Sequence, residues 1–338
     1  MRALVFAGPS RAEVHEVPDP VARPGEVVVA VERAGLCGTD VELFAGDLSY
    51  LQTGLTRYPL RPGHEWCGVV TAAGSEAESA WLGRRVTGDT MIGCGACHRC
   101  RAGRHHVCAD RNEVGIRGAI PGALAERLAV PAHTLHALPD ALDPVAGALV
   151  EPGGNALRSV RAAALTPGER LLILGTGTIG LLAALFARAQ GLDVHLRGRD
   201  PAQLALARDL GFPEATDGPW DAVIDATNDR TSPSLALDLV EPGRRIVYIG
   251  LSGVPSTIDT RELVLKDVTA VGILGASAGL PGAIAAYADG SVDPRPLVGA
   301  TITLDEVAAA LAGNRPATAG PGPKLLVDPA ALLAFQQR

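Results

Sequence analysis

The sequence predicts an α/β protein built from two parts, and three observations lead to this prediction. A length of 338 residues is typical of two domains of ordinary size. Residues 1 to about 148 contain short β-rich runs separated by turns with Pro and Gly, which is typical of an antiparallel sheet with long loops. From Leu171 onward strands and helices alternate, which indicates a doubly wound parallel sheet.

The individual elements follow from local patterns. In the first part, strands are expected at residues 1–9, 25–31 and 68–71. In the second part, a strand at 171–174 leads through a glycine turn into an Ala- and Leu-rich helix over 179–190. Asp200 followed by Pro201 begins the next helix, and Gly211 ends it. Later strands are expected at 222–227, 245–250, 268–274 and 324–327, with a helix near 305–312.

Composition and charge exclude several classes of protein. With 47% hydrophobic and 20% charged residues, the chain has enough apolar material for packed cores, so whole-chain disorder is excluded. A net charge of −7, with no basic stripe outside one Cys-rich loop, argues against a nucleic-acid partner. The N-terminal apolar run is too short for a signal peptide, and no run spans a bilayer. We therefore expect a cytoplasmic protein without a membrane partner.

Four cysteines lie in one Gly-, Arg- and His-rich loop with the spacing CxxCxxCx7C. Four thiolates at this spacing can surround Zn²⁺ in a tetrahedron, and since all four positions are filled, the ion would be structural. An iron–sulfur cluster is the competing interpretation, because four cysteines hold those too. His98, His105 and His106 lie among the cysteines and are expected to be solvated loop residues. The four cysteines are Cys94, Cys97, Cys100 and Cys108.

Two further motifs contain residues of the types that bind zinc, and a third motif indicates a nucleotide-binding site. Cys37 lies in GLCGTD, and His64 with Glu65 lies in PGHE. A site with few protein ligands and an open position is catalytic rather than structural. Downstream, GTGTIG follows the strand at 171–174 and opens a helix, so its backbone can approach a dinucleotide pyrophosphate. The residues concerned are Gly175, Gly177, Thr178, Ile179 and Gly180.

In this order, GLCGTD, PGHE, the four-cysteine loop, Glu151-Pro152 and GTGTIG resemble the zinc-containing medium-chain alcohol dehydrogenases. The sequence is most similar to the polyol, threonine and sugar dehydrogenase branch of that family, in which a glutamate such as Glu151 replaces a second cysteine ligand. The resemblance implies a GroES-like catalytic domain at residues 1–148 with a C-terminal return at 296–338. It also implies a Rossmann cofactor-binding domain at 149–295.

The resemblance also implies roles for single residues. Cys37 and His64 would bind the catalytic zinc, with Glu65 and Glu151 supplying the rest, one bound directly and the other ligating or held one water away. Asp40 would fix the tautomer of His64, and Thr39 would hydrogen-bond the substrate hydroxyl and start a proton relay. With the four-cysteine site, the chain would hold two zinc ions.

The implied function is hydride transfer between a secondary alcohol and NAD(P), the alcohol being a polyol, sugar, cyclitol or amino alcohol. By analogy the strand at 268–274 could pair across a two-fold axis and give a homodimer or homotetramer. The alternative hypothesis is a catalytically inactive, zinc-stapled protein of the same fold that binds nucleotides or regulates.

Three local features depart from the family pattern. Gly198 stands where NAD-specific members carry an acid, and it is flanked by Arg197 and Arg199, which favours NADP, although Asp200 could serve NAD instead. Gly153-Gly154-Asn155 replaces the bulky apolar residues that often follow Glu-Pro. The segment from 211 to 221 is too short for a helical crossover, so one Rossmann helix is expected to be missing.

Overall fold

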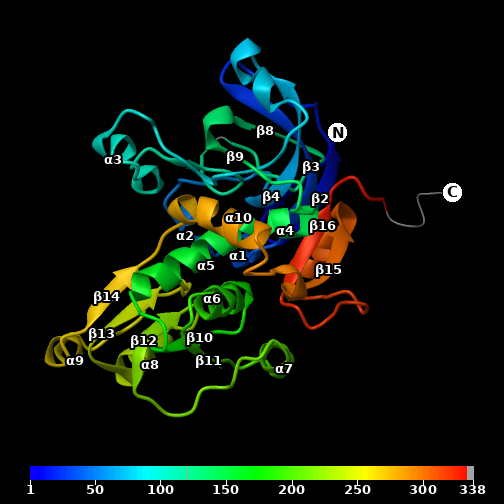
Figure 1. The fold of residues 1–338 in the computed structure, drawn as a ribbon. Helices are drawn as coiled ribbons and strands as arrows, with labels where there is room; N and C mark the ends of the chain where they lie inside the picture. Colours follow the sequence, from blue (N-terminus) through cyan, green and yellow to red (C-terminus); the bar gives the residue numbers. More distant parts are fainter. Residues whose placement is uncertain (119, 333–338) are drawn as a thin grey trace. The chain divides into compact units, whose positions relative to one another are not determined.

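The computed structural model describes residues 1–118 and 120–332, which form two compact units (Figure 1). The first unit is formed by Met1–Glu151 together with two later segments that begin at Val298 and Lys324. The second unit is formed by Pro152–Leu297 and Pro321–Pro323. The division follows the change in sequence pattern from short β-rich runs to alternating strands and helices.

The first unit contains a seven-stranded sheet in the order β15-β16-β3-β4-β5-β9, with β8 also paired to β3. Neighbouring strands are antiparallel except β15 and β16, which are parallel. Strands β15 and β16, which lie in the segment expected to form a C-terminal return, join this sheet. The strands are β3 (Glu26–Gly35), β4 (Glu65–Ala73), β5 (Arg85–Gly88), β8 (Arg127–Pro131), β9 (Leu135–Ala137), β15 (Val298–Thr303) and β16 (Lys324–Asp328).

Short helices and two small sheets complete the first unit. Its core contains Phe6, Leu43, Trp66 and Leu128, all fully buried. The remaining strands are β1 (Arg2–Gly8) with β2 (Arg11–Glu16), and β6 (Met91–Ile92) with β7 (Asn112–Glu113). The helices are α1 (Gly38–Ala45), α2 (Ser49–Gln52), α3 (His98–Arg101), α4 (Pro144–Ala148) and α11 (Val307–Leu311), with 3₁₀ turns η1 (Glu76–Trp81), η2 (His105–Val107), η3 (Ala132–Thr134) and η6 (Leu304–Glu306).

The second unit contains a five-stranded, fully parallel sheet in the order β11-β10-β12-β13-β14, as the alternating pattern predicts. Helix α6 packs against β10 and β11, and α8 packs against β12 and β13. The strands are β10 (Arg170–Leu174), β11 (Asp193–Arg197), β12 (Trp220–Asp225), β13 (Val240–Tyr248) and β14 (Thr269–Gly272). The helices are α5 (Val150–Ala163), α6 (Thr178–Ala189), α7 (Pro201–Asp209), α8 (Ser232–Leu239), α9 (Thr260–Leu265) and α10 (Leu280–Ala288), with 3₁₀ turns η4 (Ser277–Gly279) and η5 (Arg295–Leu297).

The connection from α7 to β12 contains no helix, which confirms the expected shortening. Instead the chain makes a single parallel bridge between Leu196 and Glu214 before it reaches β12. The predicted start of α7 is also confirmed, since Asp200 Oδ1 accepts the N–H groups of Ala202 at 2.8 Å and Gln203 at 3.3 Å. Packing explains the glycine at position 153, because a Cβ on Gly153 would lie 2.1 Å from the hydroxyl oxygen of Tyr287.

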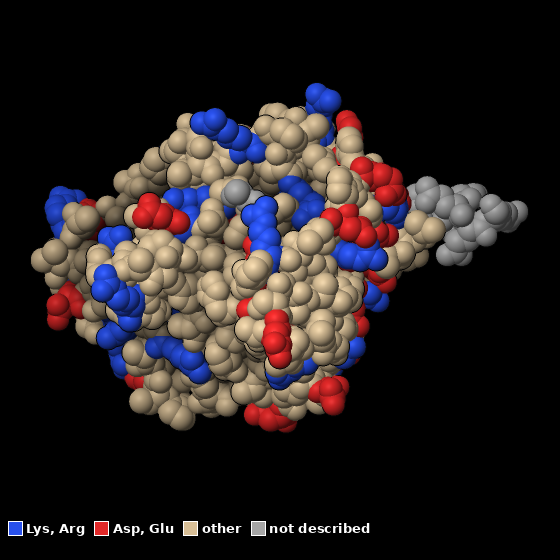
Figure 2. All heavy atoms as spheres, turned by 90° about the horizontal axis from the view of Figure 1, so that it is seen from above, with Lys and Arg blue, Asp and Glu red and all other residues tan. Residues whose placement is uncertain are grey.

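The surface and the helices add two observations. Acidic and basic side chains are interspersed among uncharged residues on the face that Figure 2 shows. Among the described residues, no helix combines the length and apolar character needed to cross a bilayer.

Candidate metal and cofactor sites

Cys37, His64 and Glu65 come together in the first unit. Each offers one donor atom, and these atoms all lie within 4.8 Å of one another. Cys37 directly precedes α1, while Glu65 is the first residue of β4. The pairing of β3 with β4 places Gly35 opposite Glu65, so the register of the sheet brings the GLCGTD and PGHE motifs side by side.

Backbone contacts hold the cluster in place. The carboxylate of Asp40 accepts the Cys37 N–H at 2.9 Å, and the Thr90 hydroxyl donates to the carbonyl of His64 at 3.1 Å. A Cβ at position 35 would lie 2.1 Å from Glu65 Oε2, so only glycine leaves room for that carboxylate. Thr39 is the second residue of α1 and is half-buried.

Buried polar atoms in this cluster lack protein partners. Asp40 Oδ1 lies 3.8 Å from His64 Nδ1, which is within ion-pair range but too long for a hydrogen bond. Both atoms are buried, and neither has a hydrogen-bond partner among the described residues. Burial raises the pKa of Asp40. Burial alone lowers the pKa of His64, but the charges of Asp40, Cys37 and Glu151 raise it well above its usual value.

These features fit a cation. The negative groups that favour a proton on His64 equally favour a metal ion beside it. Sulfur, nitrogen and carboxylate oxygen are the donors that zinc binds in proteins, and donor atoms this close together suit a tetrahedral ion. The residues present therefore fit zinc.

Lys324 is a residue of this site that the sequence interpretation missed. Its Nζ lies 2.6 Å from Glu65 Oε2, with both side chains almost fully buried, and it also donates to the carbonyl of Leu36 at 2.8 Å. Lys324 begins β16, far from Glu65 in the chain. The available signal was weak: it is one of only two lysines in an arginine-rich sequence. Glu151, near the start of α5, is buried but lies outside the 4.8 Å cluster.

The four loop cysteines form a second cluster whose sulfur atoms also lie within 4.8 Å of one another. The distance from Cys97 Sγ is 3.5 Å to Cys100 Sγ and 3.8 Å to Cys108 Sγ, and Cys94 Sγ lies 4.0 Å from Cys100 Sγ. Sulfurs bound to one zinc at about 2.3 Å lie about 3.8 Å apart. The Cys100 N–H bond to Cys97 Sγ is the main reason that the pKa of Cys97 falls to about 6, whereas burial raises that of Cys100 to about 12. The loop fits a structural zinc.

The expectation that the three loop histidines are all solvated is wrong for His105. Its Nε2 lies 2.7 Å from Asp89 Oδ2, and Asp89 is buried. The hydrogen bond that His105 donates to the carboxylate of Asp89 raises the pKa of His105. Asp89 also accepts the N–H of Met91 at 2.9 Å, so His105 ties the cysteine loop to β6. A sequence pattern cannot reveal this contact, because 16 residues separate its partners.

The glycine turn lies at the carboxyl end of β10 in the second unit. Gly175 has φ of +104°, which favours glycine, and a Cβ on Gly180 would lie 2.0 Å from the carbonyl oxygen of Gly175. Gly177 caps α6 without a side chain, and a Cβ there would meet nothing within 4 Å. The N–H groups of Thr178 and Ile179 belong to the first turn of α6 and have no acceptor within the helix, which fits a pyrophosphate.

The end of β11 bears on the choice of cofactor. A Cβ on Gly198 would lie 2.4 Å from the hydroxyl oxygen of Thr176, so this position has no room for an acidic side chain. Asp200 is engaged as the cap of α7. Arg199 pairs with Asp229, whereas Arg197 makes only a long, 3.7 Å contact with the exposed Asp217.

Comparison with known proteins agrees with this geometry. The family model for the alcohol dehydrogenase GroES-like domain matches residues 23–140, and that for zinc-binding dehydrogenases matches residues 178–289. An L-threonine 3-dehydrogenase of Cutibacterium acnes is 35% identical over 297 residues, covering 81% of this chain and 84% of that protein. This chain belongs to the zinc-containing medium-chain alcohol dehydrogenase family.

Solved structures of medium-chain dehydrogenases have the same fold as this chain. A putative zinc-binding dehydrogenase from Sinorhizobium meliloti 1021, bound to NADP, superposes with a TM-score of 0.87 at 30% identity, covering 97% of this chain and 99% of that one. An alcohol dehydrogenase from E. coli CFT073, complexed with NADH, gives a TM-score of 0.87 at 25% identity with the same coverage. The GroES-like and Rossmann-like architecture expected from the sequence is confirmed.

Proposed function

We propose that this dehydrogenase oxidises a small secondary alcohol that is a polyol, a sugar, a cyclitol or an amino alcohol. The enzyme is a zinc-dependent oxidoreductase, a class that transfers a hydride between an alcohol and NAD(P). The observation that carries the proposal is the cluster of Cys37, His64 and Glu65, where sulfur, nitrogen and oxygen donors lie within 4.8 Å of one another. The L-threonine 3-dehydrogenase relatives act on an amino alcohol, which supports the substrate class.

The residues of the cluster have separate tasks in this proposal. Cys37, His64 and Glu65 hold the catalytic zinc, with Glu151 as a further carboxylate nearby. Bound there, zinc would act as a Lewis acid that makes an alcohol proton easier to remove, and the nicotinamide would accept the hydride. Thr39 Oγ1 accepts a hydrogen bond from the substrate hydroxyl and, as it takes up that proton, releases its own proton toward solvent, for which its half-buried position is suited. Asp40 orients His64 through its charge, and the ion pair with Lys324 positions the carboxylate of Glu65.

A substrate panel tests the proposal. Purified enzyme is assayed with secondary alcohols from the four classes, with NAD⁺ and NADP⁺, and nicotinamide absorbance reports turnover. We expect turnover of at least one class, and its loss on treatment with a chelator and return on addition of zinc. Nucleotide binding without turnover of any alcohol would support the inactive protein instead.

For the cofactor, we propose that the enzyme prefers NADP⁺ over NAD⁺. Arg197 carries a guanidinium that is only weakly paired, and guanidinium groups bind phosphate through two parallel hydrogen bonds. Replacing Arg197 by Gln is expected to lower kcat/KM with NADP⁺ by about 10- to 100-fold and to change the value with NAD⁺ little. Arg208→Gln, which removes the same charge from the last turn of α7, is the matched control. A wild-type enzyme that favours NAD⁺ would contradict the proposal.

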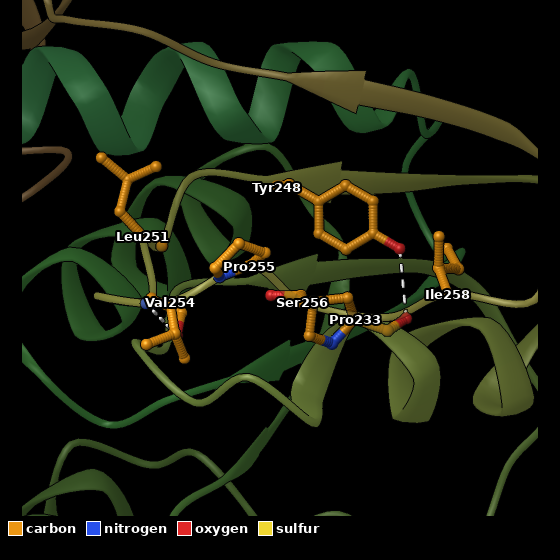
Figure 3. A pocket seen from close by; sticks show the side chains of 9 residues that line it. Pro233, Tyr248, Leu251, Val254, Pro255, Ser256 and Ile258 are labelled. Carbon is orange, nitrogen blue, oxygen red and sulfur yellow. Dashed lines mark hydrogen bonds between the residues drawn. The ribbon is translucent and has the colours of Figure 1, made fainter. Parts of the chain in front are cut away.

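We further propose that the enzyme assembles into homodimers or dimers of dimers through the second unit. Strand β14 lies at the edge of the parallel sheet and is largely exposed. Four large apolar side chains of the same unit are more than half exposed: Leu251 at 71%, Val254 at 52%, Val264 at 74% and Leu265 at 77%. Two of them, Leu251 and Val254, line a cavity of about 320 Å³ with Tyr248, whose hydroxyl donates to the carbonyl of Pro233 (Figure 3). Apolar surface of this kind marks contacts between proteins.

The oligomer proposal is checked by sedimentation velocity. The wild-type enzyme is expected to sediment as a dimer or tetramer, and Val264→Glu with Leu265→Glu is expected to shift it toward monomer, because charges would be buried without partners. A monomeric wild type would contradict this expectation.

The six cysteine thiols form no disulfide bond, which suits the reducing conditions of the cytoplasm. We propose that the enzyme acts in this compartment.

A further inference from the structure

A cavity of about 230 Å³ in the first unit has an unusual lining. Arg57 and Arg61 both line it, and the other lining residues are uncharged, among them Thr56, Leu60, Ile116 and Pro121. Among the lining residues that the structure describes, two are therefore positively charged and none is acidic. Two positive charges at the same cavity raise the affinity of that cavity for anions.

Arg61 is the informative member of this pair. Its Nε is fully buried, and its guanidinium makes no hydrogen bond or ion pair with any residue that the structure describes. The residues outside the described ranges carry no Asp or Glu. Burial lowers the pKa of Arg61 to about 10. A partly buried arginine whose buried Nε has no partner is costly, and a bound anion would offset that cost.

Several other partly buried arginines of the same unit form ion pairs. Arg111 lies 2.8 Å from Glu113, and Arg33 lies 2.8 Å from Asp328. Arg61 thus departs from the pattern that this unit follows elsewhere. The acidic partner that Arg61 lacks is a group that an anionic ligand can supply.

The cavity lies close to the metal cluster. Arg61 is three residues before His64, so their Cα atoms are at most about 11 Å apart even in fully extended chain. The wall of the cavity also touches the PGHE motif, because a Cβ on the lining residue Gly115 would lie 2.7 Å from the carbonyl oxygen of Gly63. The long side chain of Arg61 and a small hydroxy acid can together span such a distance.

We propose that Arg57 and Arg61 bind the acidic group of the substrate, a carboxylate or a phosphate, while its hydroxyl lies at the Cys37–His64 cluster. The inference rests on the function proposed above and narrows it to acidic alcohols, such as hydroxy acids or polyol phosphates. A planar guanidinium can bind either group through two parallel hydrogen bonds. Arg61 supplies the buried contact, and the exposed Arg57 supplies a second charge at the same cavity.

A binding experiment tests the cavity without turnover. Thermal unfolding of the zinc-loaded enzyme is followed with increasing inorganic phosphate or malonate for wild type, Arg61→Gln and Arg23→Gln. Arg23 is exposed and lies outside the cavity lining, so its variant controls for the lost charge. We expect a saturable rise of the unfolding midpoint in wild type and Arg23→Gln that is absent in Arg61→Gln. Equal responses in all three proteins, or none in wild type, would overturn the proposal.

Matched substrates test the assignment to the substrate. Sorbitol is compared with sorbitol 6-phosphate, and 2-butanol with 3-hydroxybutyrate. The wild type is expected to favour an acidic member of a pair, and Arg61→Gln is expected to reduce that preference about 10- to 100-fold, mainly through KM, with partial rescue by Arg61→Lys. If acidic and neutral alcohols are turned over equally, this inference fails while the proposed function stands. If no alcohol is turned over, the proposed function fails, and with it the assignment of the anion to the substrate, while the phosphate titration still reports on the cavity.

Discussion

Replacing Cys37 by Ser is expected to abolish turnover and to remove the catalytic one of the two zinc ions that we propose. The thiolate is one of three donors within 4.8 Å of one another, and a serine hydroxyl is a much weaker zinc ligand. Lewis-acid stabilisation is worth several kcal/mol, so we expect kcat to fall by about a thousandfold or more. The fold is expected to survive, because the Cys37 backbone N–H, not its sulfur, makes the hydrogen bond to Asp40. Steady-state kinetics and a zinc count on the purified variant measure both effects.

Cys97→Ser is the matched control for this experiment. It also removes one thiolate, but from the four-cysteine loop, where the sulfur atoms lie 3.5–4.0 Å apart. We expect it to lose the other zinc ion and to make the loop sensitive to limited proteolysis, since metal binding there offsets the entropy of ordering the loop. If the two variants lose the same ion, or if Cys37→Ser retains two ions and full turnover, the two-site assignment is wrong.

Much of the fold could be predicted because its signals are local. The strand, glycine turn and helix around GTGTIG lie within about 20 residues, and the Asp200 cap of α7 acts on its next neighbours. The cysteine loop is equally local, with its four sulfur atoms in one cluster. Spacing along the chain is sufficient for such features. The pairing of Cys37 with His64 depended on resemblance, and the structure shows its physical origin in the register of β3 against β4.

The sequence could not provide contacts between distant segments. Lys324 reaches Glu65 across 259 residues, because β16 returns to lie beside β3. The His105 contact with Asp89 and the unpaired guanidinium of Arg61 likewise appear only when the chain is folded. These residues affect the local balance of charge in the folded protein, but they do not change the hydrophobic periodicity or the motif spacing of the sequence. Periodicity and spacing therefore do not reveal them.

Replacing Lys324 by Met is expected to destabilise the first unit strongly. Lys324 and Glu65 form an ion pair of 2.6 Å with side chains 3% and 2% exposed, so the variant removes the ammonium group that contacts a buried carboxylate. Removing one member of a buried pair costs about 3–5 kcal/mol of unfolding free energy. Urea unfolding of the zinc-loaded enzyme at pH 7.5 measures the loss. Lys266→Met is the control, because Lys266 bonds only backbone carbonyls and its loss is expected to cost about 1 kcal/mol.

The double variant Lys324→Met, Glu65→Gln separates charge from packing. With both charges gone, we expect much of the lost stability to return, although the zinc content should fall because a candidate ligand is missing. Burial alone lowers the pKa of Lys324, but Glu65, Cys37 and Asp40 raise it above its usual value. The stability from this raised pKa is therefore complete below about pH 10 and is lost only as the pH rises through the folded-state pKa. An equal loss in Lys324→Met and Lys266→Met at pH 7.5 would show that the pair with Glu65 contributes no special stability.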